Sequence, residues 1–349
     1  MKPWLMRLAF LGALAFLGLT VFNASWLADT PRGMVKLVSH GGAMQYFDRE
    51  AVAADGCSAT AIEPVSHPYL ENTGAGALRA VELGTWMVAV DLARTADDQL
   101  VVFGDTELDC RTNGSGPVSA KTAEELVKLD AGYGYTADGG ATFPLRGEGV
   151  GAIRPVDILW RYVGPQRRVF YKFSSNDPAQ ADLLAAKMAA AGRDPAESKD
   201  AFYGPPEPIA RIRQLYPDNW AFSPDAARQC ASDYVMTGWY GAVPDSCKGG
   251  TMLIPVDAQW KFWGWPNRLI QRMEEHGGQV IVTGPEIDGY DMTGLTMPEQ
   301  LGDVPNTFNG YLWVDDSWTV IPAFKPKLDG RRDSQKEAAA EALAKRRAN

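Results

Sequence analysis

A long apolar segment opens the chain. Lys2 and Arg7 precede the run LAFLGALAFLGLTVF, which begins at Leu8, and residues 8–28 carry no charged side chain. At roughly 1.5 Å per residue, a helix of this length spans about 30 Å, the thickness of the hydrocarbon core of a bilayer. Positive charge before the run and none directly after it favours a cytoplasmic N-terminus. The pattern predicts one N-terminal transmembrane or signal helix.

A cleaved signal peptide has the same pattern of charge and hydropathy. Its cleavage site needs a small residue three positions before the cut, at a small-x-small motif. In FNASWLADT, Phe22 and Trp26 occupy that position for the two alanine candidates. We therefore favour an uncleaved anchor in the inner membrane with the body in the periplasm. With cleavage, the body would be secreted.

Beyond residue 31, short apolar runs alternate with helical stretches. The helices expected are 74–84, 122–130, 177–192 and 265–278. The strands expected are 34–39, 86–93, 99–105, 167–173, 219–223, 232–238, 251–257, 278–284 and 310–316. Near-continuous apolar strands separated by helices are typical of a parallel sheet covered on both faces. The strands suffice to close a (β/α)₈ TIM-type barrel, an α/β fold whose chemistry lies at the C-terminal strand ends.

Three segments follow from this pattern: the anchor and linker (1–31), the barrel (32–328) and a charged tail (329–349). From Arg331 on, the tail holds six basic and three acidic residues and lacks a broad apolar face. A solvated helix accounts for such a composition. A weak electrostatic contact with anionic lipid is the alternative.

The composition narrows the class of protein. With 46% hydrophobic and 22% charged residues, the 349-residue chain is an ordinary globular protein, which excludes disordered and collagen-like classes. A net charge of −9 makes it a poor nucleic-acid binder. No CxxC pair occurs, so the common zinc and redox motifs are absent from the sequence.

The four cysteines gain meaning in an exported body. An even number of cysteines in an oxidising compartment indicates disulfides. Four cysteines allow three pairings. We favour Cys57 with Cys110 and Cys230 with Cys247, the second pair closing a short loop of polar and turn residues.

Polar residues stand where the expected strands end. His40 follows the first strand, Glu71 precedes a helix, Asp91 lies in the second strand and Asp105 ends the third. At one barrel mouth, two or three carboxylates beside a histidine would hold a hard divalent cation and move a proton. Each residue alone has a simpler explanation: a strand-end histidine is commonly a structural hydrogen-bonding group, and a helix-start glutamate is favoured by the helix dipole.

The order of the motifs is more specific than any one of them. His40-x-Gly is followed by Glu71-Asn72-Thr73, the Asp91 strand, VVFGD and LDCRTNGSGPVSAKTAEELVKLDAG. This order resembles the glycerophosphodiester phosphodiesterase family, most densely over 36–177. The stretches GYGYTADGGATFPLRGEGVGAIRPVDIL and FSSNDP are similar to a membrane-anchored bacterial branch of that family.

The resemblance implies a (β/α)₈ barrel that cleaves glycerophosphodiesters, such as deacylated lipid headgroups, into glycerol phosphate and an alcohol. It implies a calcium or magnesium ion held by carboxylates and two histidines as general acid and base. Carried over, His40 matches the first catalytic histidine, while Glu71 and Asp91 match metal ligands. Lys172 takes the place of the family's substrate-binding lysine, shifted by two residues on the same strand face.

Three positions depart from the family pattern. Gly41 replaces a phosphate-gripping arginine, Ala89 a metal-binding glutamate and Gly104 the second histidine. Glycine exchanges no proton, and one lost acid–base group costs about 10²–10⁴ in rate. Two carboxylates would hold the cation weakly.

The sequence thus predicts a lipid-headgroup phosphodiester hydrolase with impaired or altered activity. The alternative is a non-catalytic ligand-binding or scaffold pseudoenzyme at the membrane surface.

Three further side chains, those of His67, Tyr133 and Tyr135, have two interpretations each. His67 either lies near the mouth or caps backbone groups in its loop, and His276 is expected at the surface. Tyr133 and Tyr135 line a pocket or pack within their loop.

Overall fold

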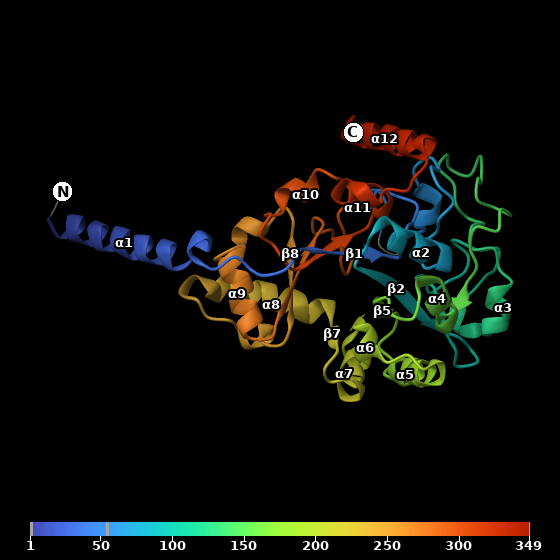
Figure 1. Ribbon diagram of the computed structural model, residues 1–349, viewed down its shortest axis with the longest axis horizontal. Helices are drawn as coiled ribbons and strands as arrows, with labels where there is room; N and C mark the ends of the chain where they lie inside the picture. Colours follow the sequence, from blue (N-terminus) through green and yellow to red (C-terminus); the bar gives the residue numbers. More distant parts are fainter. Residues whose placement is uncertain (1–2, 54–55, 349) are drawn as a thin grey trace. The chain divides into compact units, whose positions relative to one another are not determined.

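The computed structural model describes residues 3–53 and 56–348 (Figure 1). The chain forms two compact units. The larger comprises Lys36–Pro224, Thr283–Leu301 and the chain from Leu312 on. The smaller comprises the chain up to Val35, Asp225–Val282 and Gly302–Tyr311. Parallel strands alternate with helices, and the fold is the expected α/β barrel of TIM type, preceded by an apolar helix.

Six strands of the barrel belong mainly to the larger unit, where neighbouring strands follow the order β7-β6-β5-β2-β1-β10. Their bounds are β1 (Lys36–His40), β2 (Met87–Arg94), β5 (Val169–Phe173), β6 (Ala201–Tyr203), β7 (Trp220–Phe222) and β10 (Tyr311–Val314). Two short strands lie off this order: β3 (Leu100–Val102) pairs antiparallel with β2, and β4 (Arg154–Pro155) pairs antiparallel with β3.

The register of β2 decides which residues reach the barrel interior. Successive strand side chains point to opposite faces of a sheet. Val88 and Val90 pack in the hydrophobic core with residues of the covering helices, so Ala89 and Asp91 face the other way. Ala89 lies opposite His40 of β1, and Asp91 lies opposite Lys172 of β5. The register therefore brings three of the predicted site residues onto neighbouring strands.

The helices of the larger unit begin and end at the signals that the sequence carries. Thr73 caps α2, which ends at the left-handed Gly84. Thr122 and Glu125 form the expected capping box of α3. The bounds are α2 (Gly74–Leu83), α3 (Ala123–Val127), α4 (Val156–Val163), α5 (Ala179–Ala191), α6 (Pro195–Ser198), α7 (Pro206–Leu215), α11 (Ser317–Phe324) and α12 (Asp333–Ala348). The short helix α10 (Gln300–Asp303) is divided between the two units.

The smaller unit holds most of β8 (Thr251–Pro255), β9 (Gln279–Thr283), α8 (Pro224–Thr237) and α9 (Asn267–Glu275). The expected strand 232–238 is wrong, because residues 232–237 are the end of α8 and Gly238 begins a 3₁₀ helix. Pro224 stands at the start of this helix, where proline is favoured. Ala227, Cys230 and Tyr234 are then buried at helical spacing. The apolar run that resembles a strand is one face of a helix.

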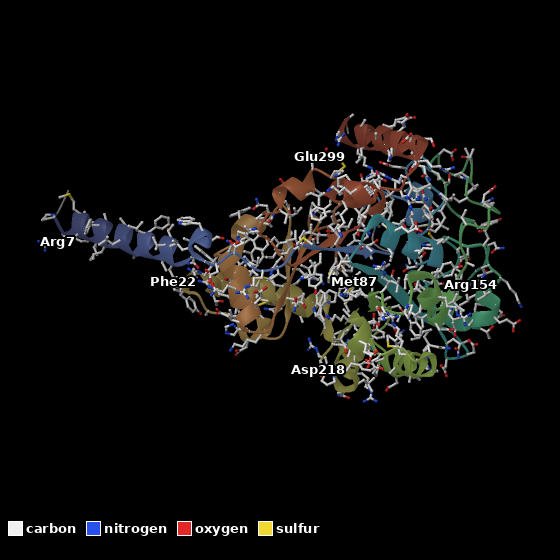
Figure 2. All side chains as sticks on the ribbon, viewed as in Figure 1. Arg7, Phe22, Met87, Arg154, Asp218 and Glu299 are labelled. Atoms are coloured by element: carbon white, nitrogen blue, oxygen red, sulfur yellow. A yellow bond between two sulfur atoms is a disulfide. The ribbon has the colours of Figure 1, made fainter. Side chains whose placement is uncertain are left out.

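The N-terminal helix α1 (Pro3–Phe22) has no buried residue (Figure 2). Within the described residues it is the one helix long and apolar enough to cross a membrane. Short 3₁₀ helices complete the chain: η1 (Ser25–Leu27), η2 (Ser58–Ala61), η3 (Val118–Ala120), η4 (Gly238–Tyr240), η5 (Asp245–Cys247), η6 (Gln259–Lys261) and η7 (Pro326–Leu328).

Two disulfides and the ion pairs of one arginine join segments outside the sheet. Both favoured disulfides are present, Cys57–Cys110 and Cys230–Cys247. The tail helix α12 is held at its end by Arg346, which bonds Glu63 and Asp316 and lies over the ring of Tyr46. The tail helix is therefore joined to the rest of the larger unit by this arginine and is not solvated along its whole length.

Candidate active site

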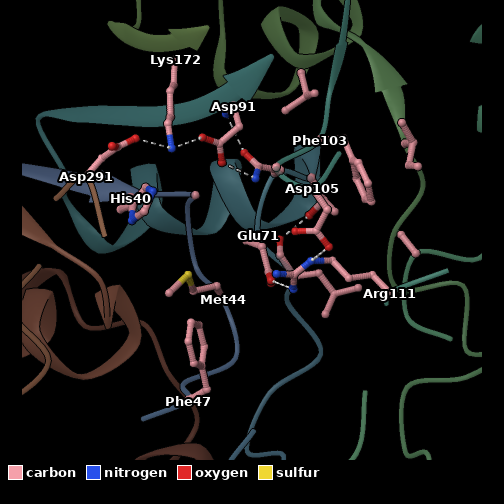
Figure 3. A pocket seen from close by; sticks show the side chains of 18 of the residues that line it. His40, Met44, Phe47, Glu71, Asp91, Phe103, Asp105, Arg111, Lys172 and Asp291 are labelled. Atoms are coloured by element: carbon pink, nitrogen blue, oxygen red, sulfur yellow. Dashed lines mark hydrogen bonds and ion pairs between the residues drawn. The ribbon is translucent and has the colours of Figure 1, made fainter. Parts of the chain in front are cut away.

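A pocket in the larger unit lies where β1, β2, β5 and β6 end (Figure 3). It is lined by the four predicted site residues His40, Glu71, Asp91 and Lys172. The topology accounts for this, because the C-terminal ends of parallel barrel strands meet at one mouth. Trp313 and Phe170 fill the barrel interior near it, with ring centroids 5.8 Å apart.

His40 is held by a buried carboxylate. Its Nδ1 lies 2.8 Å from Oδ1 of Asp315, which is 1% exposed. Asp315 Oδ2 accepts from Nε of Arg49 at 2.6 Å and from the amide of Gly294 at 2.9 Å. Burial raises the pKa of Asp315, but Arg49 and the His40 hydrogen bond outweigh it and hold that pKa below its usual range. Because an ionised carboxylate only accepts, Nδ1 of His40 donates and Nε2 is left to act on a ligand.

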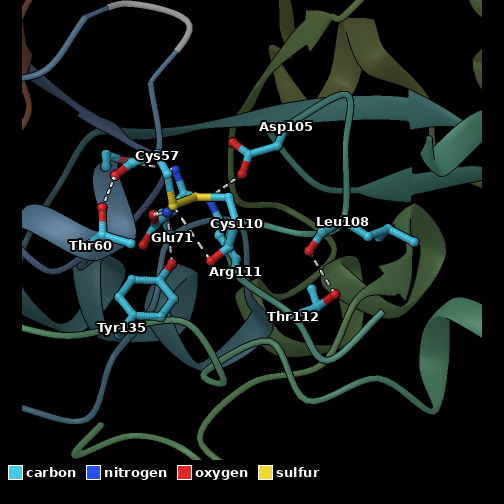
Figure 4. Close-up of a disulfide and its surroundings, with 10 residues drawn as sticks. Cys57, Thr60, Glu71, Asp105, Leu108, Cys110, Arg111, Thr112 and Tyr135 are labelled. Atoms are coloured by element: carbon cyan, nitrogen blue, oxygen red, sulfur yellow. Dashed lines mark hydrogen bonds and ion pairs between the residues drawn. A yellow bond between two sulfur atoms is a disulfide. The ribbon is translucent and has the colours of Figure 1, made fainter. Parts of the chain in front are cut away.

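Arg111 occupies the side of the pocket near Glu71. Its guanidinium donates to Glu71 and, through Nε at 2.7 Å, to Asp105. It also donates to the hydroxyl oxygen of Tyr135 at 2.8 Å (Figure 4). A further bond goes to the hydroxyl oxygen of Ser58, also at 2.8 Å. Burial lowers the pKa of Arg111, but Glu71, Tyr135 and Asp105 raise it well above its ordinary value. The guanidinium is therefore a fixed positive charge between two carboxylates.

A second ionic cluster lies around Asp91 (Figure 3). Asn72, at φ 56°, donates to Asp91 Oδ2 at 2.7 Å and accepts from the Asp91 amide at 2.9 Å. Nζ of Lys172 lies 3.7 Å from Asp91 and 3.6 Å from Asp291. Burial raises the pKa of Asp91, yet Lys172, His40 and the Asn72 hydrogen bond bring it below its usual value. Asp91 is thus ionised and paired with a lysine.

The three departures from the family pattern lie at or beside this pocket. Gly41 has φ 69°, and a Cβ there would stand 2.9 Å from Cβ of Glu71. A Cβ on Gly104 would stand 3.0 Å from both Asn72 Nδ2 and Asp91 Oδ2. Ala89 is fully buried. A side chain at position 104 would therefore lie against Asn72 and Asp91. Of the histidines in the described part of the chain, only His40 lines the pocket.

The carboxylates present do not fit a divalent cation. Calcium takes six to eight oxygen ligands, and magnesium needs a near-octahedral set. Glu71 and Asp105 share the guanidinium of Arg111, and Asp91 faces Lys172. Across residues 3–53 and 56–348 there is no group of three or more His, Cys, Asp or Glu placed to hold a metal ion. Glu71 and Asp91 lie in one pocket, but each faces a protein cation.

His67 and His276 lie outside the pocket. His67 is buried against Trp318, and its Nδ1 accepts from the amide of Tyr69 at 3.2 Å. Burial lowers the pKa of His67 to about 4, so the ring is neutral and caps backbone. His276 ends α9, where its Nδ1 lies 2.9 Å from the carbonyl of Arg272.

Sequence reasoning missed Arg49, Arg111 and Asp315. Asp315 lies in the stretch GYLWVDD, directly after β10, and its position at a strand end is a usable signal. Arg111 follows Cys110, so a disulfide fixes its backbone. Arg49 comes from the loop after β1, and nothing in its local sequence marks it. Tyr135 lines the pocket, whereas Tyr133 is partly exposed outside it.

Comparison with known proteins gives a family and a fold. Residues 58–159 match the model of the glycerophosphoryl diester phosphodiesterase family. A putative glycerophosphodiester phosphodiesterase YhdW of Bacillus subtilis is 48% identical over 65 residues, which are 19% of this chain and 27% of that protein. A glycerophosphodiester phosphodiesterase of Caldanaerobacter subterraneus matches over the same extent at the same identity. The chain thus spans about a quarter of the length of these relatives.

Solved structures agree on the fold. The glycerophosphoryl diester phosphodiesterase domain of Rv2277c from Mycobacterium tuberculosis has a TM-score of 0.57 at 16% identity, covering 84% of this chain and 99% of that one. A phosphodiesterase of Oleispira antarctica in complex with the product sn-glycerol-3-phosphate has a TM-score of 0.54 at 14% identity, covering 84% and 97%. At these identities the similarity establishes the fold alone.

Proposed function

We propose that this member of the glycerophosphodiester phosphodiesterase family binds a glycerophosphodiester in its pocket and hydrolyses it slowly. The observation that carries this proposal is His40, which is held by buried Asp315 and lines one pocket with Arg49 and Lys172. A histidine with a buried carboxylate partner is a general base, and cations beside it attract a phosphate.

Two cations are available to a bound phosphate. Lys172 is 27% exposed on its side chain, and its ion pairs are long, so its ammonium can turn toward a ligand. Arg49 uses Nε for Asp315, and its guanidinium lies 5.0 Å from the ring centroids of Phe47 and Tyr290. Arg49 therefore supplies the fixed arginine that Gly41 no longer provides.

Two buried donors add to these cations. Tyr203 Oη and Trp313 Nε1 are buried in side chains that line the pocket, and neither has a hydrogen-bond partner within the described residues. Buried polar groups are normally paired, so atoms of this kind indicate where a ligand oxygen belongs. These donors suit the oxygens of a phosphate or of a glycerol moiety.

The reaction that this arrangement supports begins at His40. Its Nε2 takes the proton of an attacking water molecule, whose oxygen bonds to phosphorus while the bond from phosphorus to the leaving alcohol oxygen breaks. Ionised Asp315 stabilises the imidazolium that forms. The leaving alkoxide then takes its proton from solvent, because Gly104 stands where the family resemblance places a second histidine to donate it. Loss of one such group costs about 10²–10⁴ in rate. Binding with slow turnover follows.

The competing function is binding without turnover. Two observations favour it: Gly104 offers no proton donor, and Glu71 is already engaged in an ion pair with Arg111. A single experiment separates the two: full-length protein in detergent is incubated with sn-glycero-3-phosphocholine and sn-glycero-3-phosphoethanolamine, and products are followed by ³¹P NMR.

The proposal expects slow release of glycerol phosphate that His40→Gln abolishes, together with binding of sn-glycerol 3-phosphate that Lys172→Met weakens. Binding without product would establish the non-catalytic function. Absence of both would refute each of them.

We also propose that α1 is a retained inner-membrane anchor with the body in the periplasm. Asn23 directly follows α1 and is 8% exposed. Its amide donates to the carbonyl of Trp239 at 2.7 Å, and its Oδ1 accepts from buried Arg272 at 3.0 Å. Arg272 also lies over the ring of Phe22, at 5.3 Å. Cleavage after Ala24 would remove these partners of a buried arginine.

The surface around the end of α1 suits a membrane interface. Trp26 is 75% exposed, and Trp239 and Tyr240 are 42% and 50% exposed. Tryptophan and tyrosine are enriched where a protein meets the headgroup region. Intact mass of the protein from the membrane fraction tests this: a mass that includes residues 1–24 supports the anchor, and a shortened soluble protein contradicts it. Protease access in spheroplasts then reports the side.

A further inference from the structure

We infer that Arg111 stands in place of a divalent cation: its guanidinium is a resident positive charge that holds Glu71 and Asp105, so the pocket works without metal. This inference deepens the proposed function of the same pocket, and its phosphate-binding consequence rests on that function. Its metal independence does not, and it is tested separately below.

The guanidinium bridges two carboxylates that come from different parts of the fold. Glu71 lies just before α2, and Asp105 follows β3. Arg111 reaches both, through different nitrogens, and also contacts the hydroxyl oxygens of Tyr135 and Ser58. A guanidinium has five N–H bonds in a rigid plane. Four of them are used here to join four side chains, which is the cross-linking that a bound cation would otherwise perform.

The Cys57–Cys110 disulfide fixes this arrangement (Figure 4). Ser58 and Arg111 are the residues directly after the two cysteines, so the bridge brings them together. Gly134 passes so close to the backbone of Cys110 that a Cβ there would stand 1.9 Å from its carbonyl oxygen, and the Gly134 amide bonds the Arg111 carbonyl at 3.1 Å. Arg111 is therefore held on both its backbone and its side chain.

A metal ion and this arginine exclude each other. An ion on Glu71 would lie beside a buried guanidinium, and like charges at such range repel strongly where water does not screen them. Removing Arg111 would leave Glu71, whose side chain is 13% exposed, and Asp105, at 25%, without their shared cation. Magnesium is commonly bound through one or two carboxylates and several waters, so two adjacent unpaired carboxylates would bind a divalent cation weakly. The charge of Arg111 thus decides whether the pocket responds to metal.

The first test uses the wild-type protein. Its thermal midpoint is measured with millimolar CaCl₂, with millimolar MgCl₂ and with EDTA, because a ligand that binds the native state raises the midpoint. The inference expects the same midpoint in all three conditions. A midpoint that rises with either cation, or falls with EDTA, would overturn it.

The second test creates the metal response. Arg111→Gln is expected to lower the midpoint and to regain part of the loss when CaCl₂ or MgCl₂ is added. Arg146→Gln is the matched control, because Arg146 contacts the carbonyl of Tyr133 and the rings of Tyr133 and Phe143. The control should show no cation response. A folded Arg111→Gln without a cation response contradicts the inference.

Two further measurements keep the idea testable if Arg111→Gln does not fold. Arg111→Lys retains the charge and loses the planar fork, so it should fold with a lower midpoint and still ignore calcium. Binding of sn-glycerol 3-phosphate to wild type in EDTA then separates the two proposals. No glycerol phosphate binding with unchanged metal independence would remove the proposed function and leave the role of Arg111 intact.

Discussion

Asp315→Asn is the substitution that tests the His40 pair most directly. Asp315 accepts three hydrogen bonds, from His40, Arg49 and the Gly294 amide. An asparagine of the same shape has one acceptor oxygen and one amide NH₂ group. Because this NH₂ group is itself a donor and must face at least one of the three donors, that hydrogen bond is lost, and Arg49 loses its negative partner.

The magnitude follows from these contacts. A buried donor left unsatisfied costs about 1–3 kcal/mol. Breaking a buried ion pair by removing one partner costs about 3–5 kcal/mol. Because Arg49 keeps 10% side-chain exposure and stacks on two rings, we expect the free energy of unfolding to fall by about 3 kcal/mol. Turnover should fall by about 10²–10⁴, since Nδ1 loses the acceptor that orients the ring.

The assay is urea unfolding with ³¹P NMR of product release, and Asp316→Asn is the matched control. Asp316 is the adjacent buried carboxylate, but it pairs with Arg346 and caps α11. It should lose stability and keep the pH profile of turnover. Equal turnover in wild type and folded Asp315→Asn would refute the role of the pair. Because the pKa of Asp315 is depressed, its stabilisation is present above about pH 4 and is lost as pH falls through the folded pKa, so the stability difference should shrink in acid.

Three other predictions concern stability. His67 has a pKa of about 4 in the fold, so wild type should lose about 2 kcal/mol between pH 7.5 and 5 as the unfolded state takes up its proton, and His67→Gln should lose less in urea titrations. Replacing Cys57 and Cys110 by serine opens a loop of sequence separation 53 and should lower the free energy of unfolding by about 4 kcal/mol. Glycerol phosphate binding, measured by calorimetry, should also weaken, and unchanged binding would contradict the role of the disulfide in holding Arg111 at the pocket. Arg193→Met breaks a buried pair with Asp200 and should cost about 3–5 kcal/mol by denaturation without changing ligand affinity.

Local sequence patterns foretold the parts of the fold that local physics decides. Strand positions, the capping box at Thr122 and the end of α5 before Gly192 follow from side-chain periodicity and backbone preference. The segment 232–238 was missed because its apolar run fits a strand as well as one helix face, and the buried neighbours of Tyr234 settle the matter.

The sequence by itself determined the barrel class, the apolar N-terminal helix and the gathering of His40, Glu71, Asp91 and Lys172 at one pocket, because parallel strands present their C-terminal ends at a common edge. The family resemblance also implies a missing acid–base group at Gly104, which carries no side chain. Only the tertiary structure decided what each charge faces. Glu71 and Arg111 are 40 positions apart, and His40 and Asp315 are 275 apart, so no local pattern pairs them. Their pairing is set by which loops the closed sheet brings together, and there an arginine, not a further carboxylate, lies against Glu71.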